Sequence, residues 1–130
     1  MSEQKKRILL VADDVALIAT LRDELEASGF AVEPVATSEE ALRKIHERPP
    51  DVILLDLLLP GEIDGMGLLS RLKRSDRTKA IPIVVLSSVA DEYEAQAVLD
   101  LGAGAIFRKT RHVLPDLVGQ IQALLKIGGS

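Results

Sequence analysis

Three aspartates stand at the ends of aliphatic runs, where a carboxylate could do chemistry. Asp13 and Asp14 follow the run at residues 8–12, and Asp56 lies between two aliphatic runs in VILLDLLLP, residues 52–60. An ionised carboxylate is costly to bury without a partner, so we expect Asp56 at the end of its run rather than buried within it. A carboxylate can itself act as a nucleophile and form an aspartyl-phosphate.

Ser87 and Lys109 follow two later aliphatic runs and would complete a site for phosphoryl transfer. Three carboxylates close together repel one another, which raises a pKa or requires a cation between them. Because the chain has no Cys and no His near these positions, an all-oxygen site suits Mg²⁺, with Mn²⁺ as the other candidate. Asp56 would then attack phosphorus, the metal and Lys109 would neutralise charge, and Ser87 would sense the transferred group.

The elements that must position these residues are short apolar runs alternating with helical patterns. The chain has 130 residues, which predicts a single domain over residues 1–130 with a core at about 6–126. Aromatic residues make up only 2%, so the core must be aliphatic. Solid runs, typical of strands covered on both faces, lie at 8–12, 52–55, 81–86 and 105–107, with a weaker one at 30–36.

Helical patterns fill the gaps between these runs. They are predicted at 15–27, from a capping box at 37–40 to Pro49, and at 66–74, 91–100 and 113–126. Five strand–helix units predict an α/β fold, a doubly wound five-stranded parallel sheet. Pro34 cannot donate to a strand ladder, so its strand belongs at an edge, which favours the flavodoxin-like (βα)5 order 2-1-3-4-5. That order brings all the candidate residues to one edge of the sheet.

Composition excludes several classes of function. A formal net charge of -4 argues against a nucleic-acid or anionic-membrane surface. The absence of Cys excludes disulfides and thiolate chemistry and is compatible with a cytoplasmic location, which we expect. The first apolar run is too short for a signal peptide, and no stretch approaches the ~18 apolar residues of a membrane span.

Each candidate residue also has an ordinary structural explanation. An Asp after a strand is usually a turn or cap residue, and Asp13 and Asp14 could cap the first helix. Ser87 could simply be a serine at a strand end, which is common, and Lys109 could belong to a solvated basic cluster at 108–111. His46 and His112 are interpreted as surface residues. Each of these explanations suffices for one residue alone. That chance would bring all the candidates to one edge of the sheet is much less expected.

Five motifs in order resemble the receiver domain of two-component response regulators over about residues 6–126. They are the Asp13-Asp14 pair, DLLLP with Asp56, Asp64-Gly65, IPIVVLSS with Ser87, and GAGAIFRK with Lys109. The resemblance implies that Asp56 accepts a phosphoryl group from the phosphohistidine of a sensor histidine kinase or a histidine phosphotransfer protein.

The resemblance also implies a ligand set and two partner residues. Asp14 and Asp56 would bind Mg²⁺ directly, Asp13 through water, and Leu58 through its backbone carbonyl. Ser87 matches the switch hydroxyl of the family and Lys109 its lysine. The adjacent small residue, Ser88, would leave phosphate access.

Three positions depart from the family pattern. The loop PGEID at 60–64 is one residue longer than the commonest form, and Thr110 follows Lys109 where Pro is frequent, which removes the usual ground for a cis peptide. Ile106 stands where many receivers carry an aromatic residue that swings inward, so output must use backbone shifts after the fourth and fifth strands or another residue.

Leu58 and Val89 would flank attacking water without activating it, which predicts a long-lived phosphate. The alternative is that both are surface aliphatics with no kinetic role.

The function expected is a phosphorylation-driven signalling switch rather than a turnover enzyme. We expect no output domain after residue 126, so a stand-alone receiver would bind an unknown downstream protein, relay its phosphate, form a phosphorylation-linked homodimer, or be a fragment of a larger protein. The surface expected to change is 88–101 with the last helix. One alternative is a pseudo-receiver scaffold. Another is a Mg²⁺-dependent aspartyl phosphatase, against which Leu58 stands where a second acid is usual.

Overall fold

The computed structural model describes residues 5–87, 92–108 and 114–125, and within them the predicted alternation of strands and helices is confirmed. The strands are β1 (Arg7–Val11), β2 (Ala31–Val35), β3 (Val52–Asp56), β4 (Ile83–Ser87) and β5 (Ala105–Arg108). The helices are α1 (Val15–Ala27), α2 (Ser38–Glu47), α3 (Gly65–Arg74), α4 (Glu92–Asp100) and α5 (Leu114–Leu125). The strands form one parallel sheet in the order β2-β1-β3-β4-β5, as predicted.

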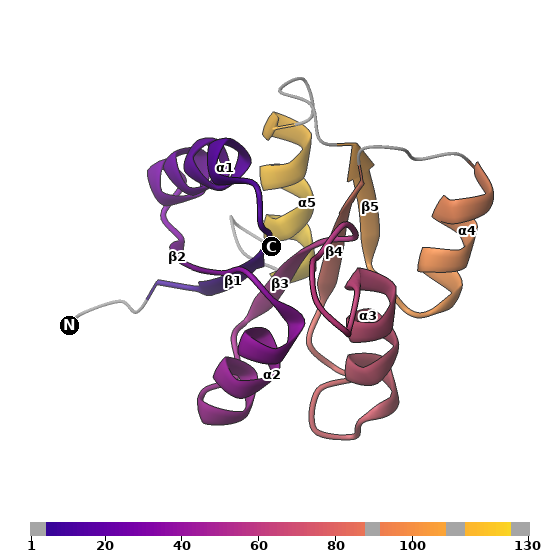
Figure 1. Ribbon diagram of the computed structural model, residues 1–130. Helices are drawn as coiled ribbons and strands as arrows, with labels where there is room; N and C mark the ends of the chain where they lie inside the picture. The colour runs from indigo at the N-terminus through magenta and orange to yellow at the C-terminus, as the bar shows by residue number, and fades with distance from the viewer. Residues whose placement is uncertain (1–4, 88–91, 109–113, 126–130) are drawn as a thin grey trace.

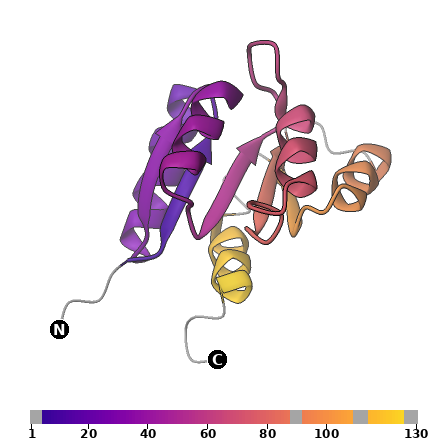
Figure 2. The same cartoon turned by 90° about the horizontal axis from the view of Figure 1, so that it is seen from below.

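The sheet is covered on both faces (Figures 1 and 2). Helices α1 and α5 pack against one face, where they contribute Leu21, Leu25, Leu117 and Ile121 to an aliphatic cluster. Helices α2, α3 and α4 pack against the other face, whose cluster includes Ile45, Leu69 and Val98. Successive strand residues point to opposite faces, so each strand feeds both clusters. This double cover explains why the strand sequences are solid rather than alternating.

Position in the sheet explains the burial of each strand. All five residues of β3 and of β4 are buried, which fits their places between other strands. The edge strand β2 has only two buried residues, Val32 and Val35, and carries Pro34 opposite Leu10. The edge place predicted from Pro34 is therefore confirmed.

Side-chain caps fix where two of the helices begin. The Thr37 hydroxyl accepts a bond of 3.1 Å from the Glu40 amide, and the Glu40 carboxylate accepts one of 3.1 Å from the Ala36 amide. The predicted capping box is present, but its acidic end reaches one residue further back than the cap itself. Helix α3 begins at Gly65 rather than at residue 66, because Asp64 caps it by accepting a 2.8 Å bond from the Gly67 amide.

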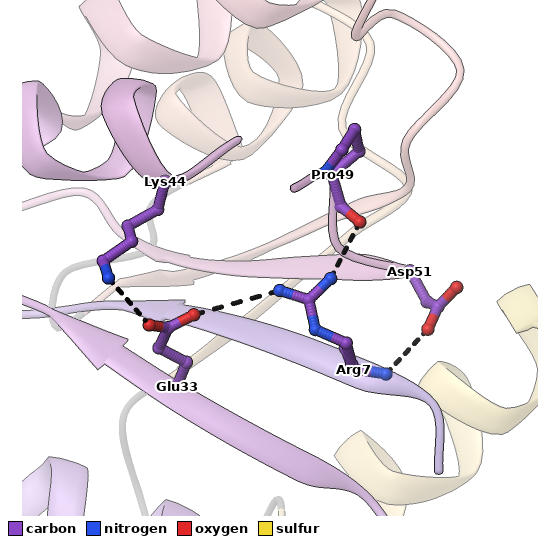
Figure 3. Close-up of polar contacts among 5 residues, drawn as sticks. All are labelled: Arg7, Glu33, Lys44, Pro49 and Asp51. Atoms are coloured by element: carbon purple, nitrogen blue, oxygen red, sulfur yellow. Dashed lines mark hydrogen bonds and ion pairs between the residues drawn. The ribbon is translucent and has the colours of Figure 1, made fainter. Parts of the chain in front are cut away.

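Charged side chains join β1, β2 and α2 at the edge of the sheet where the strands begin (Figure 3). Glu33 pairs with Lys44 at 3.3 Å and with Arg7 at 3.9 Å. Arg7 also donates from its guanidinium to the Pro49 carbonyl and from its amide to the Asp51 carboxylate, at 3.0 and 2.7 Å. Exposed ion pairs are each worth under ~1 kcal/mol, so they add to a fold held mainly by aliphatic packing. None of the described helices has the length and apolar character needed to cross a membrane.

Candidate functional site

The carboxyl ends of four strands meet at one edge of the sheet. In the register, Val11 of β1 lies opposite Leu55 of β3, and Asp56 lies opposite Leu86 of β4. Ser87 lies opposite Arg108, the last residue of β5. Asp56 is therefore flanked by the end of β1 on one side and by the end of β4 on the other, as the predicted strand order requires.

Asp56 is the last residue of β3, and it is buried, with only 1% of its surface exposed. The expected place of Asp56 at the end of its run is confirmed, but the expectation that it is not buried is wrong. The following segment folds back over the strand end, where Leu57 and Leu59 are buried in the core cluster. Asp56 Oδ1 accepts a 2.9 Å hydrogen bond from the Leu58 amide, and this amide is one of the groups that stabilise the buried carboxylate.

Gly65 makes this return of the chain possible. Its amide donates to the Leu57 carbonyl at 3.3 Å. A Cβ at residue 65 would lie 2.5 Å from the Leu57 Cα and 2.8 Å from the Asp56 carbonyl oxygen, which is closer than side-chain carbons ever approach backbone. The Asp64-Gly65 motif therefore has two structural roles, because the aspartate caps α3 and the glycine lets that helix start against the end of β3.

Asp13 and Asp14 follow β1 and are both exposed. Asp14 is the N-cap of α1, and its Oδ1 accepts a 3.1 Å bond from the Leu17 amide. The structural explanation given for Asp14, a helix cap, is thus confirmed. A carboxylate has two oxygens with several lone pairs, so a capping bond to one oxygen does not exclude a metal-binding role.

The predicted metal ligands lie at the ends of neighbouring strands but do not form a closed cluster. Within residues 5–87, 92–108 and 114–125, no group of three or more Asp, Glu or His side chains is arranged to hold a metal ion. The predicted ligands are three carboxylates and the Leu58 backbone carbonyl, all of them oxygen donors. That donor chemistry fits Mg²⁺ or Mn²⁺, which keep several waters when few protein ligands are present. The ligand set of Asp13, Asp14, Asp56 and Leu58 stays a prediction.

Ser87 ends β4 and is also buried, with 3% of its surface exposed. Its hydroxyl donates a 2.8 Å hydrogen bond to Oε1 of Glu94 in α4. The sequence reasoning missed Glu94, although one signal was present. Glu94 lies four residues before Val98, a buried residue of α4, so both project from the same side of the helix.

Several residues with a predicted role or position fall outside the described part of the chain. They are the site residue Lys109, which directly follows Arg108 in the sequence, together with Ser88, Val89, Thr110 and the expected surface residue His112. Their predicted roles are neither supported nor contradicted by the geometry.

The residue at the position of the family aromatic, Ile106, packs against the cluster shared by α2, α3 and α4. The neighbouring Phe107 packs against the opposite cluster, shared by α1 and α5. Phe107 therefore cannot replace an aromatic side chain at 106, because successive strand residues point to opposite faces. An output route that does not use an aromatic rotamer stays the expectation.

Comparison with known sequences gives a consistent result. The family model described as the response regulator receiver domain matches residues 8–119. The phosphate regulon transcriptional regulatory protein PhoB of Rhizobium meliloti is 35% identical over 120 residues, which cover 92% of this chain and 52% of that protein. The transcriptional regulatory protein PrrA of Mycobacterium tuberculosis is 36% identical over 124 residues, covering 95% and 52%. The chain thus spans about half the length of these curated relatives.

Solved structures agree with the sequence comparison. A crystal structure assigned as a response regulator from Chloroflexus aurantiacus superposes with a TM-score of 0.87 at 30% identity, covering 95% of this chain and 100% of that one. The crystal structure of the Mn²⁺-bound form of the response regulator Rcp1 superposes with a TM-score of 0.77 at 29% identity, covering 92% and 91%.

Proposed function

This chain belongs to the response regulator receiver domains, phosphoacceptor switches of two-component signalling rather than turnover enzymes, and we propose that Asp56 is its phosphoacceptor. The single observation that carries the proposal is the position of Asp56. It is the last residue of a central strand, buried, and flanked by the ends of β1 and β4. Among the buried residues that the structure describes, Asp56 is the acidic one.

The reaction is an in-line transfer from a phosphohistidine. A carboxylate oxygen of Asp56 attacks the phosphorus atom and forms the new P–O bond. The P–N bond to the donor imidazole breaks, and the imidazole keeps the electron pair and takes up a proton. The Leu58 amide donates to Asp56 Oδ1, which helps to orient the carboxyl group for attack on the incoming phosphorus atom.

A divalent cation at this edge would supply charge neutralisation for the phosphoryl oxygens. Asp14 and Asp56 are the proposed direct ligands, with the Leu58 carbonyl, and Asp13 would act through water. The support is the oxygen-only donor set at the ends of two paired strands and the Mn²⁺-bound form of the similar Rcp1. Mg²⁺ is the ion proposed for this chain.

Ser87 and Lys109 are proposed to bind the transferred group. The Ser87 hydroxyl can donate to one phosphoryl oxygen, and the Lys109 ammonium can neutralise another. Support for Ser87 is its place at the end of β4, one residue beyond the partner of Asp56 in the register. Support for Lys109 is its place in the sequence directly after Arg108, the partner of Ser87.

The proposed donor is a sensor histidine kinase or a histidine phosphotransfer protein, meeting the chain in the cytoplasm. Phosphorylation would shift a two-state equilibrium, and a downstream protein, a second copy of this chain or a further relay protein would respond to the altered surface after β4 and β5. No direct contact with nucleic acid is proposed for this domain, whose sequence carries a formal net charge of -4.

Acetyl phosphate treatment followed by intact-mass measurement tests the proposal. The wild-type chain should gain one phosphate with Mg²⁺ present and much less when the metal is chelated. Asp56→Ala should gain none. Asp76→Ala is the matched control, because Asp76 is a highly exposed carboxylate outside the strand ends and its loss should leave the gain unchanged. A phosphate gain retained in Asp56→Ala would contradict the proposal, and no gain in wild type would favour the scaffold alternative.

A further inference from the structure

The hydrogen bond between Ser87 and Glu94 joins the end of a central strand to a helix. Ser87 continues the row of Ile83 and Val85, whose side chains pack on the sheet face that α4 covers. Its hydroxyl donates to Glu94 Oε1 at 2.8 Å. A bond to a carboxylate is charge-assisted and roughly twice as strong as a neutral one. The contact is thus strong enough to fix the rotamer of a buried hydroxyl.

Glu94 lies on the side of α4 that faces the sheet, which is why it can reach Ser87. Glu94 lies one turn before Val98, which is fully buried against the sheet, so both side chains project from the inner side of the helix. Gln96 lies on the exposed side, where its amide bonds to Asp100 within the same helix. Movement of Ser87 and movement of α4 are therefore connected through Glu94.

A serine hydroxyl has one proton, so it donates to one acceptor at a time. In the proposed function that proton goes to a phosphoryl oxygen on Asp56. In the structure it goes to Glu94. Asp56, Ser87 and Glu94 each make other interactions as well, but the hydroxyl proton cannot serve both acceptors. The bond to Glu94 and the bond to the phosphoryl group therefore exclude each other.

We propose that Glu94 is a positioning residue that holds the Ser87 hydroxyl in the unphosphorylated state and releases it when a phosphoryl group arrives on Asp56. This inference rests on the proposed function and adds a regulatory contact to it. Release removes one tie between β4 and α4, so phosphorylation loosens the hold of the strand on that helix. The contact also opposes phosphorylation, because its loss is part of the cost of reaching the phosphorylated state.

Titration with beryllofluoride, a phosphoryl analogue, tests the contact in the whole chain with Mg²⁺ present. Binding can be followed by nuclear magnetic resonance of the backbone amides. Glu94→Ala should bind the analogue about tenfold more tightly than wild type, the change expected from losing a competing charge-assisted hydrogen bond. Glu94→Gln keeps an acceptor without the charge and should fall between the two. Gln96→Ala should match wild type. Equal affinity for Glu94→Ala and wild type would overturn the proposal.

The same comparison in a Ser87→Ala background separates positioning from general electrostatics. If Glu94 acts through the hydroxyl, Glu94→Ala should have almost no effect once Ser87 is replaced. If Glu94 only repels the incoming anion, its replacement should strengthen binding equally in both backgrounds, and Glu94→Gln should equal Glu94→Ala. That second pattern overturns the proposal even if the first titration succeeds.

Failure of the proposed function would look different. A wild-type chain that takes up neither beryllofluoride nor phosphate at Asp56 would contradict the phosphoacceptor role itself. A wild-type chain that binds the analogue, with Glu94 variants unchanged, would leave the phosphoacceptor role standing and remove only the contact proposed here.

Discussion

At the scale of the residue, two of the buried polar side chains have a proposed function, and a third has none. Asp56, Ser87 and Ser38 are the buried polar residues in the described part of the chain. The first two have hydrogen-bond partners at the carboxyl edge of the sheet. The Ser38 hydroxyl, in the first turn of α2, is fully buried and has no hydrogen-bond partner there. An unpaired buried hydroxyl lowers stability.

Replacing Ser38 with alanine should therefore not lower the stability of the protein. Ser38→Ala removes the unpaired hydroxyl, and we expect the free energy of unfolding to stay equal or to rise by up to ~1 kcal/mol. Urea denaturation measures the change, with Ser28→Ala as a control, since the Ser28 hydroxyl donates to the Glu24 carbonyl at 3.0 Å. A loss of more than ~1 kcal/mol in Ser38→Ala would show that the hydroxyl does have a partner.

A second residue, Leu58, should set the lifetime of the phosphate. Its side chain is 65% exposed beside the buried Asp56, and it can neither orient nor deprotonate water. Leu58→Asn keeps the backbone amide that donates to Asp56 and adds a polar group, so hydrolysis should speed up about tenfold or more. The decay of phosphorylated protein by intact mass gives the rate. The control is Leu99→Asn, an exposed leucine in α4, which should leave the decay unchanged. A lifetime of seconds in wild type, unaffected by Leu58→Asn, would contradict this role.

At the scale of the element, types and order followed from apolar periodicity, whereas boundaries depended on capping and turns. The strand predicted from Ile81 begins at Ile83, because the Ile81 amide completes a turn by donating to the Thr78 carbonyl. The pattern at 91–100 is irregular, so it did not show that Glu94 shares the inner side of α4 with Val98. Such pairings depend on how a helix is docked, which periodicity alone does not determine.

The close contact between α3 and β3 predicts that alanine substitutions at two glycines have opposite effects on stability. Gly65→Ala should lower the free energy of unfolding by about 1–3 kcal/mol, because the new methyl group would overlap the backbone of Leu57. The same change should slow phosphorylation, since Asp56 would be displaced with its strand end. Gly119→Ala, in α5, is the matched control, because a Cβ there meets nothing within 4 Å.

Thermal and urea unfolding distinguish the two glycine variants. Gly119→Ala should raise stability by up to ~1 kcal/mol, as expected for a glycine in a helix interior. If Gly65→Ala were as stable as Gly119→Ala, the close packing of α3 against the end of β3 would be wrong.

At the scale of the whole molecule, Lys73 ties three parts of the fold together. From α3, its ammonium donates to the carbonyls of Lys79 and Ile81, both at 2.9 Å, in the turn that leads to β4. Its aliphatic chain packs beneath Gly102, in the turn after α4, where a Cβ would lie 3.2 Å from it. Burial lowers the pKa of Lys73 below its ordinary value of 10.5.

The lowered pKa gives stability a defined dependence on pH. Between the folded pKa and 10.5, the unfolded chain holds more protons at Lys73 than the folded chain does. The contribution of Lys73 to the free energy of unfolding should therefore rise with pH as the solution approaches 10.5. A neutral amine keeps two N–H donors, so both carbonyl bonds can survive deprotonation. Urea denaturation of wild type and Lys73→Met across this range measures the difference, and a contribution that falls with rising pH would contradict the burial argument.

The site was predictable to the extent that it follows from strand order. Pro34 at an edge and solid apolar runs sufficed to bring Asp56 beside the ends of β1 and β4. The burial of Asp56 was not predictable, because it depends on how residues 57–65 fold back over the strand end. The cap made by Asp14 was foreseen only as an alternative, since a carboxylate after a strand serves helix capping and metal binding equally well.

The most direct test of the central claim is to locate the phosphate within the chain. After treatment with acetyl phosphate and Mg²⁺, borohydride reduction converts a phosphorylated aspartate to homoserine, and peptide mass spectrometry then finds the altered residue. We expect homoserine at position 56, and much less of it in a sample prepared with a metal chelator. Modification at Asp13 or Asp14, with position 56 unchanged, would contradict it.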